Sequence, residues 1–97
     1  MGTIKNMDIS FDPAKSERNE RERGLSFSLV AQFDWSDAMI EEDDRKNYGE
    51  CRYRVLGYIG DRLHAVVFTP RAGKVHVISL RKANKREVKQ HEQKTQP

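Results

Sequence analysis

The sequence predicts a small α+β domain, an antiparallel twisted sheet with helices packed on one face. Its 97 residues are enough for a single domain, 1–97. The first third of the chain contains residues typical of helix starts and helix ends. Residues 52–80 consist of runs rich in β-branched and aromatic residues, separated by short turns. The expected order of elements is β-α-α-β-β-β-α.

The first third is expected to hold one strand and two helices. Residues 4–9, with isoleucine at both ends, predict a strand at the sheet edge. Asp12 is a typical N-cap with proline directly after it, and Gly24 stands where the helix would end. Ser26 can cap a second helix that runs through Phe33 and buries one of its sides.

The rest of the chain is expected to form a loop, three strands and a helix. The segment 34–46 is acidic and irregular, so we expect a solvated loop; it lacks the glycine-centred pattern of a calcium site. Asn84 stands three residues before Glu87, as in a capping box, and predicts a helix to about Glu92, with a frayed tail at 93–97. The predicted strands, joined as hairpins, are Arg52–Ile59, Arg62–Thr69 and Val75–Leu80.

Composition excludes several classes of protein. Hydrophobic residues make up 36% and charged residues 34%, which allows a modest core. No segment approaches the roughly 20 apolar residues of a membrane span, and no apolar secretory signal is present, so we expect a cytoplasmic protein without membrane contact. The single cysteine, Cys51, excludes an internal disulfide and a multi-cysteine zinc site.

Charge is divided unevenly along the chain. Residues 1–44 hold 5 Lys or Arg against 11 Asp or Glu, a net −6, while residues 45–97 hold 13 against 4, a net +9. A basic half of this size suits a polyanion such as nucleic acid. Lopsided charge can equally serve solubility, so charge by itself leaves both interpretations open.

One candidate catalytic group precedes and enters the first predicted β run. Glu50, Arg52 and Arg54 alternate, and on a strand they would share a face. A carboxylate can act as general base towards a ribose 2′-hydroxyl, and guanidinium groups can stabilise charge on the phosphate. The same spacing also fits a ladder of ion pairs on an exposed sheet.

A basic block marks the junction between the last strand and the last helix. Cations at a helix start oppose the helix dipole, so an anionic ligand explains them better than stability does, although a solvated basic cap is an alternative. The four cations are Arg81, Lys82, Lys85 and Arg86.

Three histidines offer proton-transfer chemistry. His64, His76 and His91 lack the spacing of metal ligands, so we expect no metal site and no cofactor. His64, beside arginines in a predicted strand, is the best candidate for proton transfer, with a packing role equally open. For His76 we favour a packing role.

These residues resemble a known family, the BrnT toxins of bacterial type II toxin-antitoxin modules, over about residues 8–92. Where many members have histidine and aspartate, this chain has Arg23 and Asn47, so no role is transferred to either. The resemblance is carried by four stretches, Phe11–Lys15, Arg23–Phe27, Tyr48–Glu50 with Arg52, and Ile78–Glu87.

The resemblance implies a RelE-like fold and a metal-independent endoribonuclease that arrests translation. It also implies neutralisation by a BrnA-type antitoxin in a heterotetramer that contacts DNA only through the antitoxin. Glu50, Arg52 and Arg81 match the active-site pattern of the family, and His64 matches a position that is histidine in many relatives.

Our hypothesis is that the 2′-hydroxyl of RNA attacks the adjacent phosphate. Glu50 or His64 would take its proton, and Arg52 and Arg81 would stabilise the transition state. The competing interpretation is a module that binds nucleic acid or an acidic protein without catalysis, or a toxin that has lost activity. Residues expected to bind flanking phosphates are Arg54, Lys82, Lys85 and Arg86.

Overall fold

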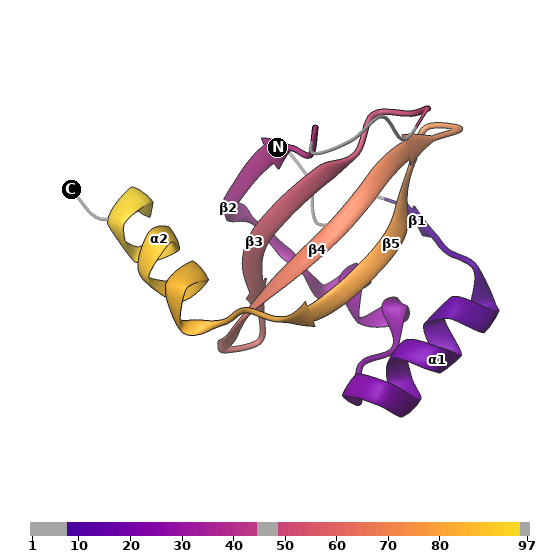
Figure 1. The fold of residues 1–97 in the computed structure, drawn as a ribbon, viewed down its shortest axis with the longest axis horizontal. Helices are drawn as coiled ribbons and strands as arrows, with labels where there is room; N and C mark the ends of the chain where they lie inside the picture. Colours follow the sequence, from indigo (N-terminus) through magenta and orange to yellow (C-terminus); the bar gives the residue numbers. More distant parts are fainter. Residues whose placement is uncertain (1–7, 45–48, 96–97) are drawn as a thin grey trace.

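The computed structural model describes residues 8–44 and 49–95. Its five strands form one sheet in the order β1-β5-β4-β3-β2 (Figure 1). The elements are β1 Ile9–Ser10, α1 Pro13–Arg23, the 3-10 helix η2 Phe27–Gln32, β2 Asp34–Glu42, β3 Tyr53–Ile59, β4 Arg62–Arg71, β5 Lys74–Lys82 and α2 Lys85–Thr95.

The sheet is mixed, which corrects the prediction of a wholly antiparallel one. β2, β3, β4 and β5 pair antiparallel, whereas β1 pairs parallel with β5, Ile9 opposite Val75. Short turns force neighbouring strands to run antiparallel, but the long connection between β1 and β5 imposes no such direction. The predicted strand at 4–9 is represented by Ile9; Ile4 lies outside the described residues.

The prediction of a solvated loop at 34–46 was wrong for most of its length. Asp34–Glu42 is strand β2, at the edge of the sheet beside β3, with a register shift between Asp34 and Met39. Exposed acidic side chains hid the strand signal, and charge on an edge strand is a common protection against pairing with other chains. The end of the predicted loop, 45–46, lies outside the described residues.

The helix starts follow the local signals. The Asp12 carboxylate accepts the Ala14 N–H at 2.9 Å, and Gly24 ends α1 with φ 73°, a conformation that glycine adopts without strain. Ser26 caps the next helix as expected, although that helix is a short 3-10 helix, which buries Phe27 and Val30.

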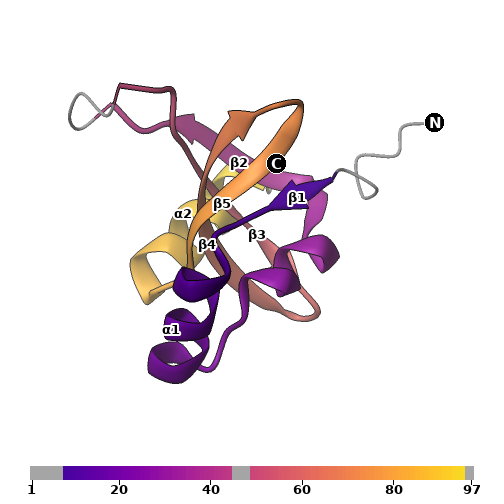
Figure 2. The same ribbon diagram turned by 90° about the vertical axis from the view of Figure 1, so that its right-hand side faces the viewer.

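The expectation that all helices pack on one face was wrong, because η2 and α2 lie on opposite faces of the sheet (Figure 2). Consecutive residues of the central strands, such as Val55 and Leu56, are both buried, so each face needs a cover. Val55 belongs to the main core with η2, whereas Leu56 packs in a second cluster with Ala83 and Val88 beside α2. α2 also continues to Thr95, three residues beyond the predicted end.

The main core is closed by an approach of Phe33 to the backbone of β3. A Cβ at Gly57 would lie 2.7 Å from Cε2 of Phe33 and closer still to Cζ, so any larger residue there would require the buried Phe33 ring to shift. Phe33 is almost fully buried and stacks edge-on against Trp35 at 4.8 Å.

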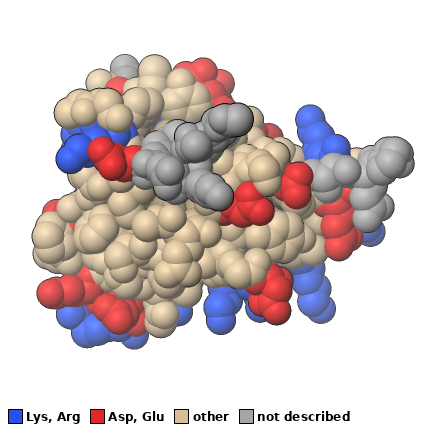
Figure 3. Space-filling model, turned by 180° about the vertical axis from the view of Figure 1, so that it is seen from behind, with Lys and Arg blue, Asp and Glu red and all other residues tan. Residues whose placement is uncertain are grey.

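We call the face of the sheet away from η2 the open face. α2 packs over the end of this face that carries Leu56. The residues on the open face include Arg54, Leu56, Ala65, Val67 and Arg81. In the view from behind, on the η2 side, the described surface is largely uncharged in the middle, and Lys, Arg, Asp and Glu gather mainly towards its rim (Figure 3). Among the described residues, no helix is long and apolar enough to cross a membrane.

Candidate active surface

Two predicted arginines lie on the open face, brought there by different strands. Arg54 in β3 is opposite Val67 of β4, and Arg81 in β5 is opposite Ala65 of β4. Neighbours in register share a face, so the β3-β4-β5 pairing places both guanidinium groups on the same side of the sheet. Arg54 also pairs with the Glu41 carboxylate of β2 at 2.6 Å.

Glu50 lies three residues before β3, between two arginines. Its carboxylate accepts a hydrogen bond from Nε of Arg52 at 3.3 Å and another from Arg71, at the end of β4, at 3.0 Å. Strand β3 begins at Tyr53, so Glu50 and Arg52 precede it rather than belong to it. Thr69 holds this segment by donating to the Cys51 carbonyl at 2.6 Å.

Charges around Glu50 set its ionisation. The hydrogen bond from Arg71 is the main cause that lowers the pKa of Glu50, with Arg52 adding to it, so the carboxylate is ionised at neutral pH. His76 of β5 lies within the electrostatic reach of the same charges. Burial is the main cause that lowers the pKa of His76, and the Arg71 charge lowers it further, whereas the Glu50 charge raises it. We call Glu50, Arg52, Arg71 and His76 the Glu50 cluster.

Arg81 is held at the other end of the open face. Its guanidinium donates two hydrogen bonds to Glu87, each 2.8 Å, and this pair lowers the pKa of the Glu87 carboxyl. The predicted capping box is confirmed, because Glu87 accepts the Asn84 N–H and Asn84 accepts the Glu87 N–H, both at 2.9 Å. One carboxylate therefore positions Arg81 and caps α2.

The two arginines of the predicted catalytic set are separated along the sheet. Arg81 is in register with Ala65, which is in register with Leu56, and Leu56 follows Arg52 by four residues. Four residues of strand span about 13 Å. The backbones of Arg52 and Arg81 are therefore well separated along the sheet, and each guanidinium has its own carboxylate partner, Glu50 for Arg52 and Glu87 for Arg81.

His64 lies apart from both arginines. Its neighbours in register are Gly57 and Lys82, which places it on the η2 side of the sheet. The residue is only 4% exposed, its Nδ1 lies 2.8 Å from the Arg62 carbonyl, and burial lowers the pKa of the imidazole. His64 is thus a neutral, packed ring at neutral pH. Lys82 lies on the same side, and Lys85 and Arg86 are exposed in the first turn of α2.

One member of the Glu50 cluster, Arg71, was missed by the sequence analysis. His76, for which packing was favoured, is half-buried, and its Nδ1 lies 2.9 Å from the Ser10 hydroxyl. The sequence did contain a signal for Arg71, in the length of the turn between β3 and β4. The two-residue turn at 60–61 fixes the β3-β4 register from the pair Ile59 and Arg62, and continuing that register places Glu50 opposite Arg71. In contrast, Asn47 and Tyr48 lie outside the described residues.

A metal centre is not assembled by this part of the chain. Within residues 8–44 and 49–95, no three His, Cys, Asp or Glu side chains gather as metal ligands would. The candidate site is instead made of carboxylates, guanidinium groups and imidazoles, which suit acid-base chemistry on a phosphate ester.

Comparison with known proteins places this arrangement in a family. No match was found among curated proteins. The family model described as the ribonuclease toxin, BrnT, of type II toxin-antitoxin systems matches residues 11–87, which span β1-flanking Phe11 through the Arg81 and Glu87 pair. The chain therefore belongs to the BrnT family of ribonuclease toxins of type II toxin-antitoxin systems.

Proposed function

We propose that this protein is a cytoplasmic, metal-independent endoribonuclease whose catalytic centre is the Glu50 cluster. The observation that carries the proposal is the ionised Glu50 carboxylate held between Arg52 and Arg71, with a neutral imidazole, His76, nearby. A base, two phosphate-binding cations and a second proton-transfer group are what cleavage by the ribose 2′-hydroxyl requires.

In this proposal the 2′-oxygen attacks the adjacent phosphorus while Glu50 accepts the 2′ proton. Arg52 and Arg71 stabilise the charge that grows on the non-bridging oxygens. The bond to the 5′-oxygen breaks, and that oxygen receives a proton from a water molecule, which the neutral His76 imidazole can hold by a hydrogen bond. The products are a 2′,3′-cyclic phosphate and a 5′-hydroxyl, so protons and bonds balance without an added reactant.

Arg54 and Arg81 take a flanking role. Because Arg81 lies about 13 Å along the sheet from Arg52, we assign it to a neighbouring phosphate rather than to the transition state. Lys85 and Arg86, exposed at the start of α2, extend the same basic path. His64, buried on the opposite side of the sheet, is left out of the catalytic set.

The partner proposed is a BrnA-type antitoxin. Membership of a type II toxin-antitoxin family implies an antitoxin; its type, a heterotetrameric complex and DNA contact through the antitoxin alone are part of the proposal. Co-expression with the neighbouring gene product, followed by mass measurement in solution, tests the assembly: a complex without two copies of each chain contradicts it.

The catalytic proposal is tested by cleavage of a labelled RNA in EDTA, on free RNA and on translating ribosomes. Wild type should cleave, Glu50→Gln should be slower by about 10²- to 10⁴-fold, and antitoxin should block the reaction. Glu20→Gln is the matched control, since Glu20 is an exposed carboxylate on α1.

Equal rates for Glu50→Gln and wild type would overturn the role of Glu50, and loss of activity in EDTA that Mg²⁺ restores would overturn metal independence. A folded wild-type protein that cleaves neither substrate would favour a binding module without catalysis.

A further inference from the structure

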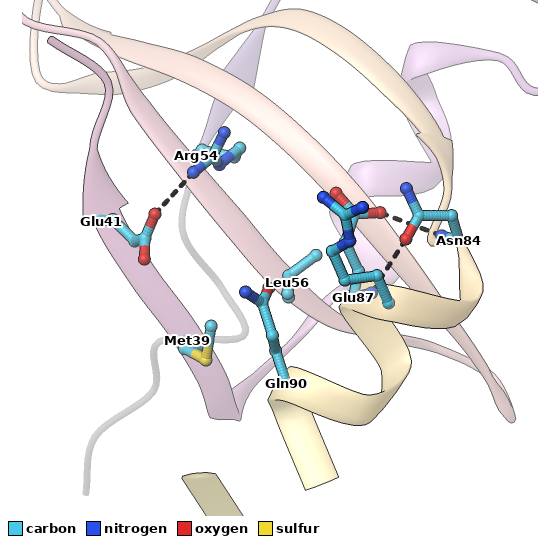
Figure 4. A pocket seen from close by; sticks show the side chains of 8 residues that line it. Met39, Glu41, Arg54, Leu56, Asn84, Glu87 and Gln90 are labelled. Atoms are coloured by element: carbon cyan, nitrogen blue, oxygen red, sulfur yellow. Dashed lines mark hydrogen bonds and ion pairs between the residues drawn. The ribbon is translucent and has the colours of Figure 1, made fainter. Parts of the chain in front are cut away.

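A pocket of about 190 Å³ lies between α2 and strands β2 and β3, next to the Arg81 end of the open face (Figure 4). Its volume equals that of about six water molecules in the liquid, which suits one flat ring system. The lining combines an apolar floor with polar side chains; its residues are Met39, Glu41, Arg54, Leu56, Asn84, Arg86, Glu87 and Gln90.

The polar side chains of this pocket differ in how many hydrogen bonds they can still make to a ligand. Glu87 is occupied by Arg81 and by the Asn84 N–H. Glu41, 52% exposed, uses Oε1 for Arg54, which leaves acceptor capacity at Oε2. The side-chain amide of Gln90 has no hydrogen-bond partner within the described part of the chain.

The ion pair of Glu41 with Arg54 places an acceptor beside a donor at the pocket wall, 2.6 Å apart. A guanidinium has five N–H donors and a carboxylate about four acceptor positions, so both can bind a ligand without separating. Met39 and Leu56 lie between β2, β3 and α2 and provide the apolar surface that a ring face prefers (Figure 4).

We propose that this pocket binds one unstacked guanine of the RNA and sets the base preference of the toxin; this rests on the proposed ribonuclease function. Guanine presents two adjacent N–H donors, N1 and N2, that one carboxylate can accept together, beside the acceptor O6, which Arg54 can contact. Single-stranded RNA is commonly recognised through splayed bases read on this edge.

The surroundings allow the RNA strand to continue in both directions. A second hollow of about 310 Å³, sharing Met39, Glu41 and Gln90, extends the pocket along α2 to Gln93 and Lys94. On the other side, Arg81 lies against Glu87 at the pocket rim. A base in the pocket would therefore have cations available for its neighbouring phosphates on either side.

The test is binding of a short, labelled oligouridine with 2′-O-methyl sugars, which cannot be cleaved, carrying one guanine or one hypoxanthine at its centre. Hypoxanthine lacks only the exocyclic amino group. Wild type should bind the guanine probe at least about fivefold more tightly, the lower end of the discrimination of one paired base contact. In Glu41→Gln this ratio should fall to about one, because an amide accepts only one of the two N–H groups.

Glu42→Gln is the matched control, since Glu42 is the next residue of β2 and points to the other face. It should keep the guanine preference. A wild-type protein without the preference, or an equal preference in Glu41→Gln, would overturn the proposal. Because the probes resist cleavage, a guanine preference in a protein that cleaves no RNA would overturn the catalytic function and leave this pocket standing.

Discussion

Replacing Arg81 with alanine separates the structural role of this arginine from its role in RNA binding. Its guanidinium makes two charge-assisted hydrogen bonds to Glu87, whose side chain is 13% exposed, while its own side chain is 38% exposed. Charge-assisted bonds contribute about 1.5–3 kcal/mol when buried, and exposed pairs about 0–1 kcal/mol.

The partly exposed pair of Arg81 and Glu87 should contribute an energy between these two limits. Glu87 keeps its bond from the Asn84 N–H in the variant, so its carboxylate is not left without a partner. We therefore expect Arg81→Ala to lower the free energy of unfolding by about 1 kcal/mol, which corresponds to a fall of about 4–8 °C in Tm for a domain of this size.

Urea denaturation measures the stability, and RNA binding over a range of salt concentrations measures the phosphate contact. The slope of log K against log salt should become shallower by about 0.7 if one single-strand phosphate contact is lost. Glu87→Gln is the companion variant: it weakens the pair but keeps the capping box, so adding Arg81→Ala to it should cost little more stability.

A loss above about 3 kcal/mol, or failure to fold, would mean that Arg81 is chiefly structural. An unchanged salt slope in a stable variant would remove Arg81 from the RNA-binding surface.

Three further predictions concern packing and pH. Gly57→Ala should lower the free energy of unfolding in urea by about 1–3 kcal/mol through overpacking against Phe33, and Phe33→Leu should recover part of this loss. A neutral Gly57→Ala would contradict the close approach. The pKa of His64 is lowered from 6.5 and that of Glu87 from 4.5, so the folded protein binds fewer protons than the unfolded chain. Stability in urea should fall as pH drops below 6.5 and again below 4.5, with the first fall reduced in His64→Asn; a rise on acidification would refute this sign. Since the pKa of Glu50 lies below its ordinary 4.5, cleavage should not lose its base until pH falls below that value; loss of activity between about pH 7 and 5 would identify a histidine as the base.

Local signals were sufficient for the features that depend on neighbours in sequence. The caps at Asp12 and Asn84 and the ending at Gly24 involve residues within one helical turn, so the chain specifies them without tertiary contacts. The hairpin register is nearly as local: a two-residue turn sets the pairing that places Arg71 against Glu50.

The tertiary structure decided which side of the sheet each group occupies. Segment 34–42 forms an edge strand, and its many charged residues kept the sequence pattern from predicting a strand. The helix α2 packs on the face opposite η2 because the central strands bury side chains on both faces. Sheet pairing likewise places His64 and Arg81 on opposite faces, and only there does Arg81 meet Glu87. Sequence alone determined the fold class, the helix starts and the family, because these depend on residue types and short spacings. Which of the candidate residues meet depended on packing between distant segments, which no local spacing specifies.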